Sequence, residues 1–182
     1  MRRSLVLHAD APCAAISQII VDIDRTKEGG LLLQYGVSGL ISDIRLAQLT
    51  PSERAHQLWR HSCFEVFARI SGQSAYQEYN FAPSSHWAAY GFASRRFGMR
   101  DLDISHPPHI ETQICEREFS LKVTVHPLAL PAGEPWEIGL SVIIEETSGS
   151  LSFWALSHPD GAADFHHDDC FALTLPPPEL TL

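Results

Sequence analysis

Positive charge is scarce in this sequence. Only two lysines occur, Lys27 and Lys122, the arginines are scattered, and the formal net charge is −9. A nucleic-acid-binding surface needs clustered basic side chains that contact phosphates, and an acidic surface is repelled by anionic lipid headgroups. The sequence therefore predicts neither a nucleic acid nor a membrane as a partner.

Long apolar runs are absent as well. No stretch reaches the length of a transmembrane helix. Near the start, the apolar run at 5–7 is interrupted by His8 and Asp10, so it is too short for the apolar region of a signal peptide. From the sequence we expect a cytoplasmic protein.

Cysteines are few and far apart. Cys13, Cys63, Cys115 and Cys170 form no CxxC pair. This spacing fits packed free thiols in a reducing compartment better than a structural zinc site or a disulfide framework. The even number still allows two disulfides.

The remaining sequence is rich in strand patterns separated by short turns. Its 45% hydrophobic and 19% charged residues are ordinary for a globular chain, and its length suits a single domain over residues 1–182. The predicted strands are 4–8, 16–24, 31–38, 64–70, 75–81, 87–92, 110–115, 119–126, 136–146, 151–156 and 170–175. We therefore predict an all-β fold, a β-sandwich of two antiparallel sheets of jelly-roll or immunoglobulin-like type with about ten strands.

One short helix is expected besides the strands. Thr50-Pro51-Ser52-Glu53 has the pattern of a capping box with proline at the first helical position. The predicted helix runs toward Leu58 and places Trp59 at the edge of the following strand.

The clearest local signal is a β-hairpin. Residues 64–70 and 75–81 have strand length, and Ser71-Gly72-Gln73-Ser74 supplies a short loop. If Ile70 is opposite Ala75, one sheet face carries Phe64, Val66, Tyr79 and Phe81, while Glu65 faces Asn80 and Phe67 faces Glu78 on the other. The first face is expected in the core, and the second is expected to carry function.

The second face has the side chains that sugar recognition requires. A pyranose offers an apolar face to an aromatic ring and a rim of hydroxyl groups to polar side chains. The candidate aromatic platforms are Trp59, Tyr76, Trp87 and Trp154, and the candidate hydroxyl contacts are Glu65, Arg69, Gln77, Glu78 and Asn80. A purely structural role is equally open, with buried tryptophans and a cross-strand ion pair between Arg69 and Glu78.

A second group of polar residues lies late in the chain. The loop 157–170 contains candidate metal ligands at His158, Asp160, Asp164, His166 and His167. Oxygen ligands would suit calcium, and imidazoles with carboxylates would suit zinc or iron, but the spacing matches no EF-hand or HExxH motif. A polar loop with a turn at Asp160-Gly161 is the favoured interpretation.

Signals for catalysis are weak. The sequence has no GxSxG motif and no phosphate-binding glycine loop. Glu65 and Glu78 could in principle serve as the two acids of a glycosidase. An enzyme acting on glycosides is thus the third hypothesis.

Three sequence runs carry a family resemblance. LWRHSCFEVFARI, AYQEYNFAPSSHWAAYGF and FWALSHPDGAADFHHDDCFAL resemble the DOMON-like domains related to family 9 carbohydrate-binding modules. The resemblance implies a two-sheet β-sandwich that binds a sugar or haem. For sugar it implies Trp59 before Glu65, Trp154 as a second ring, and hydroxyl contacts from Asn80 and Gln77.

For haem, the resemblance implies an axial methionine. Met99 is the candidate, with His86, His106 or His109 as the histidine partner. Taken together, the sequence predicts a non-catalytic domain that binds a small ligand, most simply a carbohydrate. A haem- or metal-binding module is the alternative.

Overall fold

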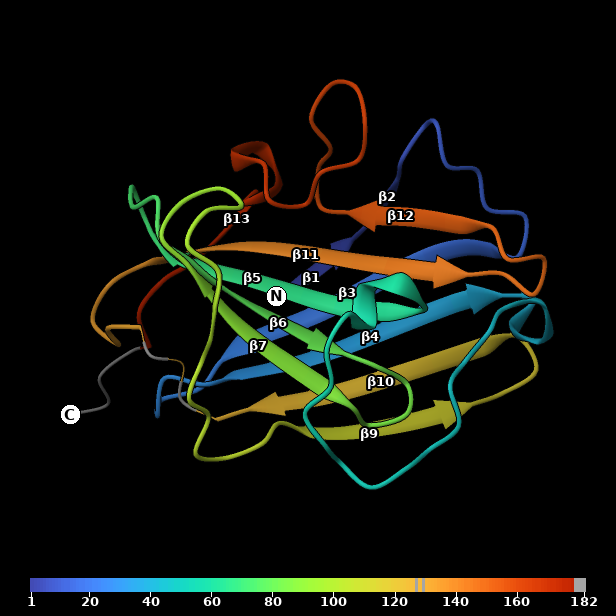
Figure 1. The fold of residues 1–182 in the computed structure, drawn as a ribbon, viewed down its shortest axis with the longest axis horizontal. Coiled ribbons are helices and arrows are strands. Elements are labelled where there is room, and N and C mark those ends of the chain that lie inside the picture. Colours follow the sequence, from blue (N-terminus) through green and yellow to red (C-terminus); the bar gives the residue numbers. More distant parts are fainter. Residues whose placement is uncertain (127, 129, 179–182) are drawn as a thin grey trace.

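Two antiparallel sheets lie face to face in this protein. The computed structural model describes residues 1–126, 128 and 130–178, so the predicted domain end at 179–182 lies outside the described residues. Within them, thirteen strands and three short 3-10 helices form the sandwich shown in Figure 1. The predicted all-β sandwich is confirmed. Its higher strand count comes from short edge strands that carry little sequence pattern.

The first sheet has five strands and a solvent-exposed outer face. In spatial order they are β1 (Arg2–Ser4), β3 (Ile16–Arg25), β4 (Leu31–Gly39), β10 (Glu118–Val125) and β9 (His109–Ile114). In β10, every second residue from Phe119 to Val125 is buried, while Lys122 between them is exposed. This strict alternation is what a sheet with one solvated face requires.

The second sheet is larger and is covered on both faces. Its strands in order are β2 (Val6–Leu7), β12 (Leu151–Ala155), β11 (Trp136–Glu145), β5 (Cys63–Ile70), β6 (Tyr76–Phe81), β7 (Trp87–Phe92) and β8 (Arg100–Asp101), and β13 (Leu173–Leu175) also pairs with β11. All residues of β6 and β7 are buried. Another layer must therefore lie over the outer face of this sheet.

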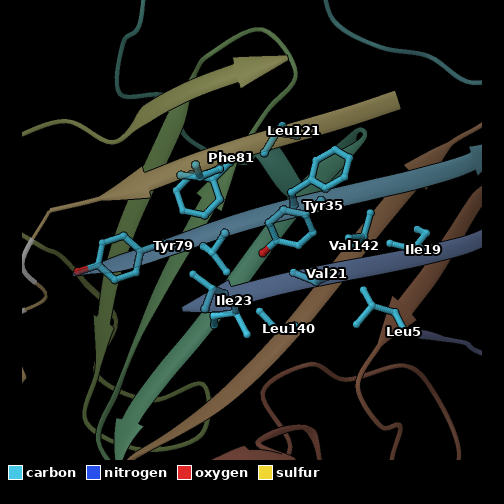
Figure 2. Close-up of a cluster of buried hydrophobic side chains, with 14 of the residues drawn as sticks. Leu5, Ile19, Val21, Ile23, Tyr35, Tyr79, Phe81, Leu121, Leu140 and Val142 are labelled. Atoms are coloured by element: carbon cyan, nitrogen blue, oxygen red, sulfur yellow. The ribbon is translucent and has the colours of Figure 1, made fainter. Parts of the chain in front are cut away.

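The core between the sheets is made by alternating apolar residues from both. Figure 2 shows Ile19, Val21 and Tyr35 of the first sheet among Phe81, Leu140 and Val142 of the second. The hydroxyl of Tyr35 donates a buried hydrogen bond of 3.0 Å to the backbone carbonyl of Glu65. This bond fixes the first sheet to β5 directly behind the Glu65 side chain.

The predicted hairpin is confirmed in its register. Phe64 pairs with Phe81, Glu65 with Asn80, and Phe67 with Glu78. The predicted division into a core face and a polar face follows, because residues that pair directly point to the same side of a sheet.

The predicted helix from Thr50 toward Leu58 is wrong. Residues 50–57 are not helical, and the helical turns of the structure are the 3-10 segments Ile41–Asp43, Leu58–Arg60 and Asp168–Cys170. Arg54 instead forms a parallel bridge with Trp87. The backbone N–H of Ala55 donates to the carbonyl of Trp87, and the N–H of Trp87 donates to the carbonyl of Glu53. The capping signal had no apolar helical face behind it, so pairing with the edge of β7 is preferred.

Two further sequence expectations concern cysteine and the membrane. All four cysteines are free. Cys63 and Cys170 are buried, as expected for packed thiols, whereas Cys115 is exposed. No helix among residues 1–126, 128 and 130–178 is long and apolar enough to cross a membrane.

Candidate functional site

The outer face of the second sheet is covered by residues 156–172, the covering segment, which connects β12 to β13. This segment rises beside β11 and β12 and returns through the last 3-10 turn to β13 (Figure 1). Its Phe165 and Phe171 pack with Phe67, Tyr76 and other outer-face residues in a second apolar cluster. The cover is incomplete and leaves a cavity of about 550 Å³ over β5, β6 and β11, within the usual size range for a small-molecule site.

A cluster of ion pairs and hydrogen bonds holds the covering segment in place. Asp164 accepts hydrogen bonds from the guanidinium groups of Arg95 and Arg96 and from the backbone N–H of His166. These contacts lower the pKa of Asp164 although burial opposes the shift. The loop 157–170 is therefore ordered by its own ion pairs.

Arg69 has a similar structural role. It bonds Glu137 on the neighbouring strand at 2.7 Å and Asp168 of the covering segment, and its guanidinium lies 4.2 Å from the ring centre of Phe171. The partner considered from the sequence, Glu78, is not involved in these bonds. Arg69 fixes the cover and does not line the cavity.

The cavity brings together five residues that the sequence singled out. Trp59, Glu65, Glu78, Met99 and His166 all line it. Sequence reasoning missed Arg60, Phe92, Arg96, Ile143, Leu151, Phe153, Ala163 and Phe165, which also line it. Because side chains alternate along β12, Leu151 and Phe153 lie on the same face of the sheet. Nothing in the sequence near them indicates that this face lines the cavity.

Glu65 and Glu78 lie diagonally on β5 and β6 at the base of the cavity. They are 2% and 5% exposed, respectively. Glu65 Oε2 accepts a hydrogen bond of 2.9 Å from Ser141, and Glu78 Oε1 accepts one of 2.7 Å from Asn80 Nδ2. Both carboxyl groups are therefore satisfied by neutral donors.

Burial changes the protonation of both carboxyl groups. It raises the pKa of Glu65 to about 8, with a further contribution from the charge of Glu78, and hydrogen bonds from Ser141 and Cys63 oppose the shift only in part. Burial likewise raises the pKa of Glu78 to about 7. The pair thus retains protons around neutral pH, chiefly because burial disfavours the ionised form of each carboxyl group.

His166 approaches the pair from the covering segment. Its Nδ1 shares a 2.7 Å hydrogen bond with the hydroxyl of Tyr76, which also accepts the backbone N–H of Arg96. Its Nε2 lies 3.7 Å from Glu78 Oε2. Burial and the charge of Arg96 lower the pKa of His166 to about 4, so the imidazole is neutral.

Aromatic rings form the cavity's edge and its support. Trp59 is 36% exposed and packs edge-on against Tyr90 with ring centres 6.0 Å apart. Tyr76 does not line the cavity but stacks on Phe92, which does, at 4.7 Å. Trp59 can therefore contact a ligand directly, and Tyr76 orients other residues.

Three predicted ligand contacts are placed elsewhere. Trp87 and Trp154 belong to the core between the two sheets, and Gln77 lies on the same face of β6, where it accepts the hydroxyl hydrogen bond of Tyr79. Trp87 pairs directly with Phe81, so its side chain must share the core face of Phe81. The structure therefore corrects the sequence hypothesis for these three residues.

The five predicted metal ligands point to different partners. His158 bonds the carbonyl of Val6, Asp164 bonds two arginines, His166 bonds Tyr76, and His167 caps the last 3-10 turn, while Asp160 lies in the exposed part of the loop. Among the described residues, no three His, Cys, Asp or Glu side chains converge as a metal site would require. The metal hypothesis gains no geometric support.

The haem hypothesis meets a similar difficulty. Met99 lines the cavity, but none of His86, His106 and His109 does, and the histidine there is His166. Its Nδ1 is bonded to Tyr76, and its Nε2 lies 3.7 Å from Glu78 Oε2. These residues do not fit an axial pair.

Comparisons with known proteins bear on the fold. Neither a family model nor a curated protein matches the sequence. Among solved structures, a "putative carbohydrate-binding protein" of Bacteroides uniformis superposes with a TM-score of 0.67 at 14% identity over 93% of this chain and 83% of its own.

Two further matches come from one family. A family 9 carbohydrate-binding module of Caldicellulosiruptor kristjanssonii in complex with cellotriose gives a TM-score of 0.60 at 11% identity, over 88% of this chain and 74% of its own. The module in complex with glucose gives 0.55 at 12% identity, over 83% and 71%. The chain therefore has the β-sandwich fold of these modules.

Proposed function

We propose that this chain is a non-catalytic domain that binds a small carbohydrate in the cavity beside Trp59. The observation that carries the proposal is the cavity itself, which combines an accessible indole ring with the buried polar groups of Glu65 and Glu78. A sugar needs both an apolar surface for its ring and hydrogen-bonding groups for its hydroxyls. The fold shared with sugar-binding modules supports this function. We also propose that the chain is related to DOMON-like domains.

Replacing Trp59 by alanine is expected to weaken sugar binding by about fivefold to a hundredfold. Loss of one aromatic platform at a binding site removes on the order of 1–3 kcal/mol, and each 1.4 kcal/mol is about a factor of ten in affinity. Isothermal titration calorimetry with the sugar that gives the largest thermal shift measures this effect. A panel of mono- and disaccharides identifies that sugar.

The control is Phe97→Ala. Phe97 is 71% exposed and lies outside the cavity lining, so its loss removes an exposed aromatic ring without touching the site. Unchanged affinity in both variants would remove Trp59 from the site. If no sugar in the panel binds the natural chain, the proposed function is rejected.

The buried carboxyl pair supports one alternative, an enzyme that acts on glycosides. A general acid must hold a proton near neutral pH, and burial keeps the pKa of both Glu65 and Glu78 in that range. On this hypothesis, the chain hydrolyses aryl glycosides and Glu78→Gln abolishes turnover. Absence of turnover, or turnover that is unchanged in Glu78→Gln, rejects the hypothesis.

A further inference from the structure

Four glutamates share the outer face of the second sheet, but only two of them have a cationic partner. Glu137 is paired with Arg69, and Glu145 is paired with Arg45 and also bonds His61. Glu65 and Glu78, which are the two at the cavity, contact no lysine or arginine within ion-pair distance in the described part of the chain. Among the described residues, the one ionisable base within that distance of Glu78 is the neutral His166.

The lack of a cationic partner at Glu65 and Glu78 is unexpected, because these two glutamates are deeply buried. A buried carboxylate is normally paired with a cation because losing water costs it several kcal/mol or more. The guanidinium of Arg96, which lines the cavity, is already bonded through Nε and Nη2 to Asp164. Arg96 thus favours the ionised forms of Glu65 and Glu78 only from a distance, and among the described residues neither carboxyl group has a lysine or arginine ion-pair partner when it loses its proton.

Asn80 adds an independent sign of a missing donor. It is fully buried, lies directly opposite Glu65, and uses its Nδ2 to bond Glu78. Its Oδ1 has no hydrogen-bond partner among the described residues. Two carboxyl groups therefore line the cavity, and one unpaired amide oxygen is buried beside them on the same sheet face.

The walls of the cavity suit a cation as well. Trp59, Phe92, Phe153 and Phe165 line it, and aromatic rings attract positive charge through their electron-rich faces. A primary ammonium group carries three hydrogen-bond donors and no acceptor. Its chemistry is complementary to acceptors enclosed by aromatic side chains.

We propose that the sugar bound in this cavity carries a protonated amino group, which lies between the carboxylates of Glu65 and Glu78. The inference rests on the proposed function, since it specifies the class of sugar. An acetylated amine or a hydroxyl at the same position lacks the positive charge that stabilises the ionised pair.

The charged groups around the pair determine how binding depends on pH. Besides each other, Glu65 and Glu78 face the Cys63 thiol, neutral His166 and the hydroxyl groups of Tyr76 and Tyr90, while Arg96 and Arg60 supply positive charge at the cavity. An ammonium ligand binds the ionised pair, so binding at neutral pH releases protons from the carboxyl groups. Affinity rises with pH until the ligand amine itself loses its proton.

The test compares sugars that differ only in the group at C2 of each ring. Glucosamine, glucose and N-acetylglucosamine form one set, and the chitosan disaccharide, cellobiose and diacetylchitobiose form a second. We expect the free amine to bind about tenfold to a hundredfold more tightly than its partners, as for a hydrogen bond to a charged group. Calorimetry in buffers of different ionisation enthalpy is expected to detect proton release with the amine alone.

The variants Glu65→Gln and Glu78→Gln keep the side-chain shape and are expected to abolish the preference for the amine. Glu111→Gln is the matched control, because it removes one negative charge from the exposed face of the first sheet, far from the cavity lining. An amine preference that persists in all three variants reflects general attraction to an acidic protein and overturns the inference.

Two other outcomes separate this inference from the proposed function. Equal binding of glucose and glucosamine, both weakened by Trp59→Ala, overturns the amine requirement and leaves the sugar site standing. No binding of any sugar in either set rejects the proposed function and the inference with it.

Discussion

At about pH 8.5, Glu65→Gln is expected to be more stable than the natural chain by on the order of 3 kcal/mol, whereas at about pH 5 the two should be nearly equal. Burial raises the pKa of Glu65 to about 8, well above the ordinary value for a carboxyl group in an unfolded chain. The folded state therefore binds this proton more tightly than the unfolded state. Stability from Glu65 is complete at acid pH and is lost as pH rises through the folded pKa.

Glutamine has no proton to lose and can keep the hydrogen bond from Ser141. Its free energy of unfolding should therefore vary less between the two pH values than that of the natural chain. Urea unfolding followed by tryptophan fluorescence at both pH values measures the difference. A pH dependence that is identical in the variant and the natural chain would show that Glu65 is not held protonated.

Glu137→Gln provides a control with the opposite sign. Burial opposes the shift, but hydrogen bonds from Arg69 and Ser71 lower the pKa of Glu137. A carboxyl group of this kind stabilises the folded state at neutral pH, and its contribution is lost as pH falls through its lowered folded pKa. This variant should thus be less stable than the natural chain at neutral pH, and the two should converge in acid.

Replacing Trp136 by alanine is expected to lower the free energy of unfolding by about 3–5 kcal/mol. Trp136 is fully buried at the point where β11 pairs with both β5 and β13. Its indole N–H donates to the carbonyl of Pro131 at 3.1 Å, and the guanidinium of Arg25 lies 3.5 Å from the ring centre. The substitution leaves a cavity and removes the surface on which Arg25 lies.

The measurement is a thermal or urea unfolding curve, and Trp59→Ala is the matched control. For a chain of this size, the loss corresponds to a fall in Tm of roughly 8–15 °C. Trp59 is 36% exposed at the cavity edge, so the same substitution there should change stability by less than about 1 kcal/mol. Equal losses at the two positions would contradict the assigned burial.

Local pattern was enough to predict the fold class and the hairpin register. Alternating residues in β5 and β6, with a short polar loop between them, allow one pairing that buries Phe64 and Phe81 together. That register also places Glu65 and Glu78 on one face of the sheet. Two central residues of the site were therefore accessible from the sequence.

The rest of the site depends on contacts between distant segments. Phe165 and His166 reach the cavity because Asp164 is bonded to Arg95 and Arg96, far away in the sequence. The sequence also offers no cue for the face on which Trp154 lies, since its neighbours Phe153 and Ala155 are apolar too. Composition suggested aromatic platforms, but only the sheet pairing separates rings in the core from rings at the cavity.

The alternation of β5 and β6 has a consequence for how this protein can change. Odd-numbered positions from Cys63 to Arg69 face the covered outer side, while Phe64 and Val66 belong to the core between the sheets. The backbone of Glu65 is held from behind by Tyr35, independently of its side chain. Substitutions at the cavity-lining outer-face positions Glu65 and Glu78 can therefore alter ligand preference without repacking the core between the sheets, and their effect on stability arises from the outer face alone.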